Sequence, residues 1–145
     1  MTLFLSKDQI AAFERDGVLV VDDVLPLDTL NAVKAEYSDL LDQMYEDWHA
    51  QGRVPPPGDM DFFQKLLAAY DAGCEWFQPM DITLPGSEIT ADTPFHIGPE
   101  VFNMLTCPQL LDMVEDLIGP EITSNPIQHV RLKPPSRTLR STETT

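Results

Sequence analysis

The amino-acid sequence predicts an α+β fold, with several helices and a few short strands. Between Pro26 and Ala50 apolar residues recur every three or four positions, which is the period of a helix with one buried face. A continuous apolar run at residues 18–21 and an alternating run at 127–133 have instead the patterns of strands. The chain has 145 residues, 43% of them hydrophobic, so it has the size of one domain and enough apolar residues for a core.

The first predicted helix follows Ser6. Ser6 and Gln9 have the spacing of a capping box, in which each side chain bonds to the other residue's backbone N–H. Gly17 supplies the left-handed residue that commonly ends a helix. The run at residues 18–21 that follows is rich in valine, and we expect a strand covered on both faces.

The clearest predicted helix extends from just after Pro26 to about Ala50. Its apolar positions are Leu30, Val33, Tyr37, Leu40, Leu41, Met44 and Trp48. Its other face carries Glu36, Asp39, Asp42, Gln43, Glu46 and Asp47. We expect that face to be in water and Trp48 to be in the core. Residues 52–58 contain three consecutive prolines, which cannot continue the helix, so they are predicted to be a loop.

The middle of the chain combines one helix with a long irregular stretch. Apolar spacing predicts a third helix from Phe62 to near Gly73. Residues 78–99 are rich in proline and glycine and are expected to be mostly irregular, with a short strand at 81–84.

The last third of the sequence predicts two helices and a strand. Residues 99–105 and 108–118 have helical patterns, each beginning with a proline, and Gly119 ends the second. Residues 127–133 alternate and are expected to form a strand that Pro134 terminates.

Charge and composition exclude several classes of function. The net charge of -15 repels phosphate backbones, so we expect no nucleic-acid partner. Residues 131–145 are the exception, with four basic residues and one acid. No window is long and apolar enough to cross a membrane, and Cys74 and Cys107 lack the spacing of a metal site. We therefore expect a soluble, cytoplasmic protein with two reduced core thiols.

Motifs for most recognisable enzyme classes are missing. The sequence has no glycine-rich phosphate loop, no nucleophile elbow and no paired-cysteine metal site. None of its three histidines begins a His-x-Asp or His-x-Glu pair, and His49 and His96 are expected to be structural. Alternation places His129, Arg131 and Lys133 on one strand face. That face is either ordinary solvent-exposed surface or a wall that binds a carboxylate.

Three segments carry a family resemblance. They are residues 13–25, which begin Phe13-Glu14-Arg15-Asp16-Gly17, residues 110–122, and the closing residues 128–135 with Lys133-Pro134-Pro135. In their order and spacing these segments resemble the phytanoyl-CoA dioxygenase family. The resemblance covers roughly residues 3–135. It divides the chain into an N-terminal part of such a domain, 1–135, and a non-matching tail, 136–145, expected to be disordered. Such an ending is typical of an early stop or a shifted reading frame.

The resemblance implies a fold and a chemistry. The family packs N-terminal helices on a double-stranded β-helix, the jelly-roll (cupin-like) barrel of iron(II) and 2-oxoglutarate dependent oxygenases that hydroxylate an unactivated carbon. This chain would contain only the helices and the first strands of an incomplete barrel.

The family's iron ligands are a His-x-Asp pair and a later histidine, which normally follow the Lys-Pro-Pro turn and are absent here. No metal ligand or catalytic residue is therefore assigned, and neither iron nor 2-oxoglutarate is expected to bind this chain strongly. The resemblance makes His129 a candidate 2-oxoglutarate contact, with Arg131 and Lys133 weaker candidates. Whether the chain is an enzyme is left open.

The alternative hypothesis is a non-catalytic binding module derived from the same fold. Such a module would use the acidic helix face and the open edge of an unfinished sheet, and that edge would also allow self-association.

Overall fold

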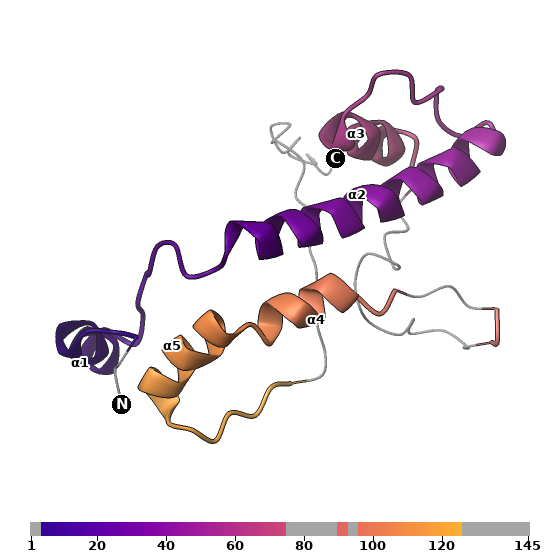
Figure 1. Ribbon diagram of the computed structural model, residues 1–145. Helices are drawn as coiled ribbons and strands as arrows, with labels where there is room; N and C mark the ends of the chain where they lie inside the picture. The colour runs from indigo at the N-terminus through magenta and orange to yellow at the C-terminus, as the bar shows by residue number, and fades with distance from the viewer. Residues whose placement is uncertain (1–3, 75–89, 93–95, 126–145) are drawn as a thin grey trace, which may run out of the picture. The chain divides into compact units, whose positions relative to one another are not determined.

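Five α-helices make up the regular structure of this protein in a computed structural model, which describes residues 4–74, 90–92 and 96–125 (Figure 1). The helices are α1 (Lys7–Asp16), α2 (Leu27–Ala50), α3 (Phe62–Asp71), α4 (Pro99–Leu105) and α5 (Pro108–Ile118). All five lie where the sequence predicts a helix. Across the described ranges, no helix is both long and apolar enough to span a membrane.

Local side-chain chemistry explains where the helices begin and end. The predicted capping box of α1 is confirmed, since the Ser6 side chain accepts from the Gln9 N–H and the Gln9 side chain accepts from the Ser6 N–H. Gly17 has the expected left-handed conformation, with φ of 70°. Asp61 and Gln64 form a second capping box at α3. The helices α4 and α5 each begin with a proline.

The predicted α+β fold class, with the first strands of a jelly-roll barrel, is wrong for the described residues, which contain helices and irregular segments but no strand. The predicted strand at 18–21 is an irregular extended segment, in which Val18 is 63% and Val20 83% exposed. A strand is stable only when a partner strand pairs with its backbone, and no described segment pairs with residues 18–21. The other two predicted strands, at 81–84 and 127–133, lie outside the described residues.

The chain divides into two units, and the boundary falls within α2 between Glu36 and Tyr37. The described residues of unit 1 are 4–36 and 98–125. Those of unit 2 are 37–74, 90–92, 96 and 97.

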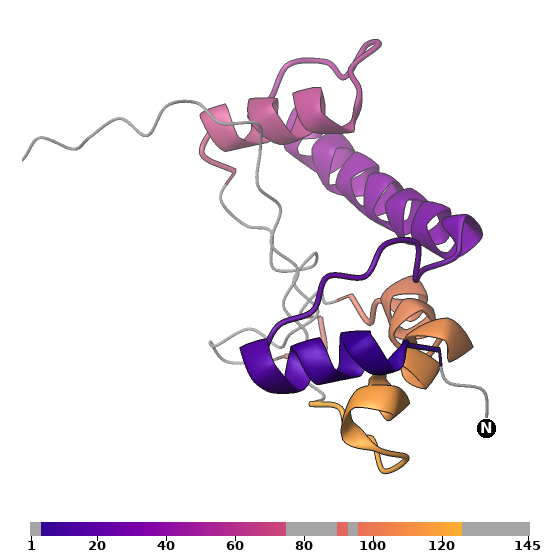
Figure 2. The same ribbon diagram turned by 90° about the vertical axis from the view of Figure 1, so that its left-hand side faces the viewer.

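Unit 1 is built around α5, which contacts both α1 and α4 (Figure 2). Only three apolar side chains of its described part are buried, those of Leu5, Val101 and Cys107. Neither α1 nor α5 contributes a buried residue. The core of unit 1 is therefore small.

Unit 2 has a larger core. Its buried side chains come from α2, α3 and the segments that follow each helix: Tyr37, Leu41, Tyr45, Trp48, Val54, Leu66, Ala69 and Cys74. Leu41 and Cys74 are completely inaccessible, and the burial of Trp48 confirms its predicted place in the core. Arg53 fastens the loop between α2 and α3 by donating a hydrogen bond to the Gly73 carbonyl oxygen at 3.2 Å. Both cysteines are free and buried, as predicted.

Candidate functional site

The predicted site residues His129, Arg131 and Lys133 lie outside the described residues, as does the strand that would present them. Their placement on one face, and their role as a 2-oxoglutarate wall, stay predictions.

The other two histidines have structural contacts. His49 is in the last turn of α2, and its Nδ1 lies 3.1 Å from the Val54 carbonyl oxygen, which accepts a hydrogen bond when that nitrogen is protonated. The half-buried His96 ring meets the ring of Tyr37 edge-on, with 6.1 Å between centroids. Both contacts agree with the structural roles predicted from the sequence.

Iron does not fit the donor groups of the described residues. No three side chains of His, Cys, Asp or Glu come together there in a way that can hold a metal ion. A non-haem iron centre needs two histidines and a carboxylate around one point. We therefore derive no catalytic step through a metal from this part of the chain.

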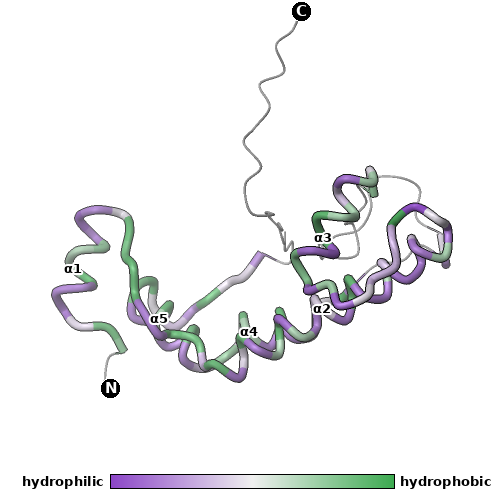
Figure 3. Tube along the Cα trace, turned by 90° about the horizontal axis from the view of Figure 1, so that it is seen from above, coloured by the Kyte–Doolittle hydropathy of each residue, from purple (hydrophilic) through white to green (hydrophobic). Residues whose placement is uncertain are grey.

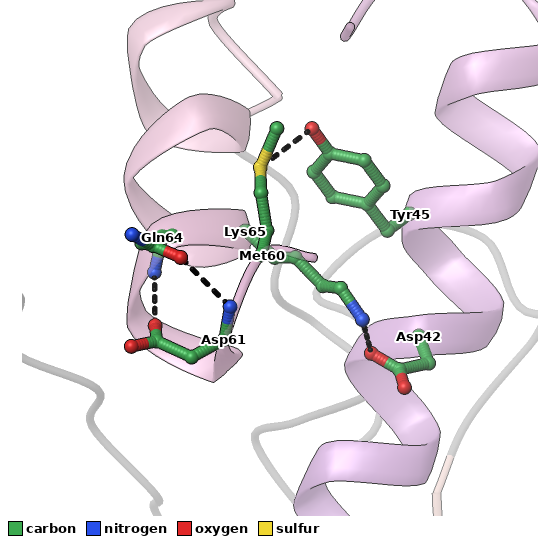
Figure 4. A network of polar contacts seen from close by, with 6 residues as sticks. All are labelled: Asp42, Tyr45, Met60, Asp61, Gln64 and Lys65. Carbon is green, nitrogen blue, oxygen red and sulfur yellow. Dashed lines mark hydrogen bonds and ion pairs between the residues drawn. The ribbon is translucent and has the colours of Figure 1, made fainter. Parts of the chain in front are cut away.

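A polar network joins α2 to α3 inside unit 2 (Figure 4). Lys65 of α3 points toward α2, and its Nζ lies 2.7 Å from Oδ1 of Asp42. The Lys65 side chain is 16% exposed and that of Asp42 is 49% exposed. The Tyr45 hydroxyl donates to the Sδ atom of Met60 at 3.7 Å. We call these four residues the α2–α3 network.

Tyr45 is the one member of the α2–α3 network whose pKa is shifted. Burial raises the pKa of its phenol above the ordinary value of 10.0, the positive charge of Lys65 opposes the shift, and the Cys74 thiol adds to it. The phenol is 1% exposed and already donates its proton to sulfur. In the described part of the chain, no buried side-chain nitrogen or oxygen is without a hydrogen-bond partner. The contacts of the α2–α3 network therefore hold α3 and the residue before its cap against α2.

Two carboxylates of unit 1 bind backbone amides that are distant in sequence. The Glu36 side chain accepts from the Glu100 N–H at 2.6 Å, at the first turn of α4. The Asp116 side chain accepts from the Leu5 N–H at 2.7 Å, just before α1. The position of Glu36 is favoured because the amides in the first turn of a helix such as α4 lack partners within the helix. No sequence motif marks these pairs.

The acidic face predicted for α2 is only partly in water. Asp42 is paired with Lys65, and Glu36 binds the amide of Glu100. The remaining members of that face are exposed: Asp39, Gln43, Glu46 and Asp47. This exposed part is the surface that the binding-module hypothesis requires.

Exposed apolar side chains are a feature of unit 1 that the sequence analysis did not anticipate. Phe4 is 43% exposed, Phe102 65% and Ile118 61%, in addition to the two valines at 18 and 20. In Figure 3, α1 and the connection after it contain hydrophobic stretches next to strongly hydrophilic ones. The described residues of unit 1 hold twelve acids and three bases, so these apolar side chains lie in an acidic surrounding.

Comparison of the chain with models of known protein families, with curated proteins and with solved structures finds no match.

Proposed function

We propose that the chain is the N-terminal part of a non-haem iron(II) and 2-oxoglutarate dependent dioxygenase of the phytanoyl-CoA dioxygenase type, a class that hydroxylates an unactivated carbon. The observation that carries the proposal is the presence of three family-like segments, at 13–25, 110–122 and 128–135, in the family's order and spacing. The chain itself is proposed to be inactive, because no histidine follows His129 to supply the iron ligands.

The described structure is compatible with this proposal in its helical part. The first segment contains the end of α1 with its left-handed Gly17, and the second contains α5 followed by Gly119. Val18 and Val20 carry large exposed apolar side chains in an extended segment. Only protein outside the described residues could cover these two side chains, which is what we expect if the described residues are part of a larger domain.

In the proposed whole enzyme, His129 contacts the carboxylate of 2-oxoglutarate, with weaker contributions from Arg131 and Lys133. A charged guanidinium or ammonium group beside an imidazole suits a carboxylate, since hydrogen bonds between charged partners are about twice as strong as neutral ones. The substrate is not assigned.

The nucleotide sequence provides the first test. Translation beyond codon 135 in all three frames is expected to contain a His-x-Asp pair within a few dozen residues. Absence of the pair from every frame would contradict the family assignment.

Ferrous ion provides the second test. The chain is titrated anaerobically with iron(II) and 2-oxoglutarate while the visible charge-transfer band is recorded. We expect no band from residues 1–145, and a band from the chain extended in the frame that carries the His-x-Asp pair. A clear band from the chain itself would overturn the proposed inactivity.

The second candidate function is a non-catalytic binding module. The observation that favours it is the exposed face of α2 with Asp39, Glu46 and Asp47, which suits a basic partner. The open sheet edge that this hypothesis also invoked has no strand among the described residues to form it. A module is expected to be a stable monomer or a defined complex with a strong near-ultraviolet dichroism signal. A part of a larger enzyme is expected to aggregate or to pack loosely, so size-exclusion profiles with dichroism separate the two.

A further inference from the structure

The helices α1, α4 and α5 of unit 1 form an open arrangement. The helix α5 contacts both of the others, whereas α1 and α4, which lie wholly within the described residues, do not contact each other. In a closed bundle the helices would enclose a core between them. Here α1 and α5 bury no residue at all. The described helices of unit 1 therefore leave apolar side chains that no second layer covers.

Apolar side chains of α1 and α5 form one region where these helices meet. The Leu5 N–H donates a hydrogen bond to Asp116, which brings the residues just before α1 to the last turn of α5. Phe4 and Ile118, which are close to these two residues in sequence, are both exposed. Half-buried apolar side chains at helical spacing continue the region along both helices. We call it the α1–α5 face, and its members are Phe4, Ile10, Phe13, Val114, Leu117 and Ile118.

The charge of these two helices is negative. Together they carry six acidic and two basic residues, and α5 has no base at all. One of the two bases, Arg15, is already paired with Asp16 at 2.6 Å. A partner that covers the α1–α5 face must therefore supply apolar side chains together with positive charge, because charged groups of one sign steer and select the opposite sign.

A helix is the partner that suits this face. The apolar side chains come from two helices in contact, and an amphipathic helix binds such a surface with its own apolar stripe. A partner strand would need a sheet edge, and the described residues of unit 1 contain no strand. The eleven-residue α5 is about 16 Å long, so a partner helix of about three turns matches its length.

Two other occupants suit the charge of the face less well. A second copy of the chain would bring a net charge of -15 to an acidic surface. The anionic lipids of a membrane surface would be repelled in the same way, since such surfaces attract basic segments.

We propose that the α1–α5 face binds a basic amphipathic helix of another protein. The apolar stripe of that helix packs on Phe4, Phe13 and Ile118, and its lysine or arginine side chains lie at the flanking carboxylates of α1 and α5. This interaction goes beyond the proposed function, since it holds whether or not the chain derives from an oxygenase. It also differs from the binding-module hypothesis, which uses the exposed acidic side chains of α2.

A labelled peptide tests the proposal on the full chain. The probe is two copies of Leu-Lys-Lys-Leu-Leu-Lys-Leu in tandem with a fluorescein label, a sequence that places leucines on one helix face and lysines on the other. A scrambled peptide of the same composition has its leucines all around the helix. Fluorescence anisotropy gives both dissociation constants, and we expect the scrambled peptide to bind about tenfold or more weakly because it buries less apolar surface. Equal affinities would overturn the proposal.

Paired variants locate the apolar contact. The double variant Phe4→Asp and Ile118→Asp removes two exposed apolar side chains of the face and adds two negative charges. A peptide held by charge alone would bind it at least as tightly as the wild-type chain, whereas we expect binding about tenfold or more weaker. The control Phe63→Asp and Tyr70→Asp adds the same charge at exposed positions of α3. Equal affinity of the two double variants would overturn the proposal.

Zero-length crosslinking maps the bound peptide on the unmodified chain, so it does not depend on the folding of any variant. A carbodiimide joins a lysine amine to a carboxylate that touches it, forming an amide while the reagent takes up the water that is lost. We expect mass spectrometry to find peptide lysines joined to acids of α1 and α5, such as Asp8, Asp112 or Glu115. Crosslinks confined to acids of unit 2, such as Glu46 or Asp47, would overturn the proposal.

The other two occupants are tested on the chain alone. We expect a monomer in size-exclusion chromatography and no binding to vesicles of phosphatidylserine and phosphatidylcholine. A dimer, or vesicle binding, that the Phe4→Asp and Ile118→Asp variant abolishes would show that occupant on the face and overturn the proposal. None of these experiments uses iron or 2-oxoglutarate, so their outcome is separate from the test of the oxygenase proposal.

Discussion

Asp116 is expected to hold the start of α1 against α5, and the Asp116→Ala variant tests this role. Its Oδ2 accepts a hydrogen bond from the Leu5 N–H at 2.7 Å, and Leu5 is only 2% exposed. Hydrogen bonds to charged groups contribute about 1.5–3 kcal/mol, and alanine leaves the amide without this acceptor. We therefore expect the variant to lower the free energy of opening of unit 1 by about 1.5–3 kcal/mol.

Hydrogen–deuterium exchange with mass spectrometry measures this loss where it occurs. Since every 1.4 kcal/mol is a factor of ten, the peptide that contains α1 should exchange about ten to a hundred times faster in Asp116→Ala. Asp112→Ala is the matched control, because Asp112 is an exposed acid on the same helix. Its effect should stay within about 0.5 kcal/mol, as for most surface substitutions.

The Asp116→Asn variant refines the result. Its side-chain oxygen still accepts the amide hydrogen but carries no charge, so we expect a loss between those of the alanine variant and the control. Equal exchange of α1 in the Asp116→Ala and Asp112→Ala variants would refute the reasoning, since the bond would then contribute nothing to the position of α1.

Three further predictions concern unit 2. Leu41→Ala should lower the free energy of unfolding by about 2–5 kcal/mol in urea titrations followed by Trp fluorescence, because the side chain is 0% exposed and leaves a cavity; a loss below 1 kcal/mol would contradict its burial. Asp61→Ala should cost about 1 kcal/mol by removing the α3 cap, with the exposed Asp59→Ala as a near-neutral control. Burial raises the pKa of the Tyr45 phenol, so the phenol ionises at lower pH in the unfolded chain than in the folded chain. The contribution of this phenol to the free energy of unfolding therefore keeps its full value below about pH 10 and falls as pH rises through the folded-state pKa of Tyr45. Tyr45→Phe should therefore show a smaller alkaline loss of stability than the wild-type chain, and an identical pH profile would argue against the shift.

The sequence predicts all five helices because their signals are local. The capping box at Ser6 and the left-handed Gly17 each act within one turn, and the prolines that begin α4 and α5 act at a single position. The apolar period of α2 persists over 24 residues, which is enough to identify its length.

The wrong strand and the missed contacts depend on partners that are distant in sequence. A run of β-branched residues at 18–21 favours an extended backbone, but a strand also needs a neighbour to pair with it. Asp116 and Leu5 are 111 positions apart, and Glu36 and Glu100 are 64 apart. The sequence shows only that Glu36 is an acid on a polar helix face, so its contact with α4 was not predictable.

The candidate 2-oxoglutarate residues cannot be compared with the structure in the same way as the helices. The positions His129, Arg131 and Lys133 depend on alternation in a segment outside the described residues, so their arrangement stays a prediction. The α2–α3 network, by contrast, lies entirely on described residues, but Asp42 and Lys65 carry no spacing signal that distinguishes them from other surface charges.

Each unit contains one concealed sulfhydryl, Cys107 in unit 1 and Cys74 in unit 2. The first is 7% and the second 0% accessible, so a thiol reagent modifies either one only after the surrounding residues have separated. The rate at which each cysteine of the unmodified protein is labelled, measured on its tryptic peptide, therefore reports how often the surrounding unit opens. Both units are followed in a single sample without any introduced probe.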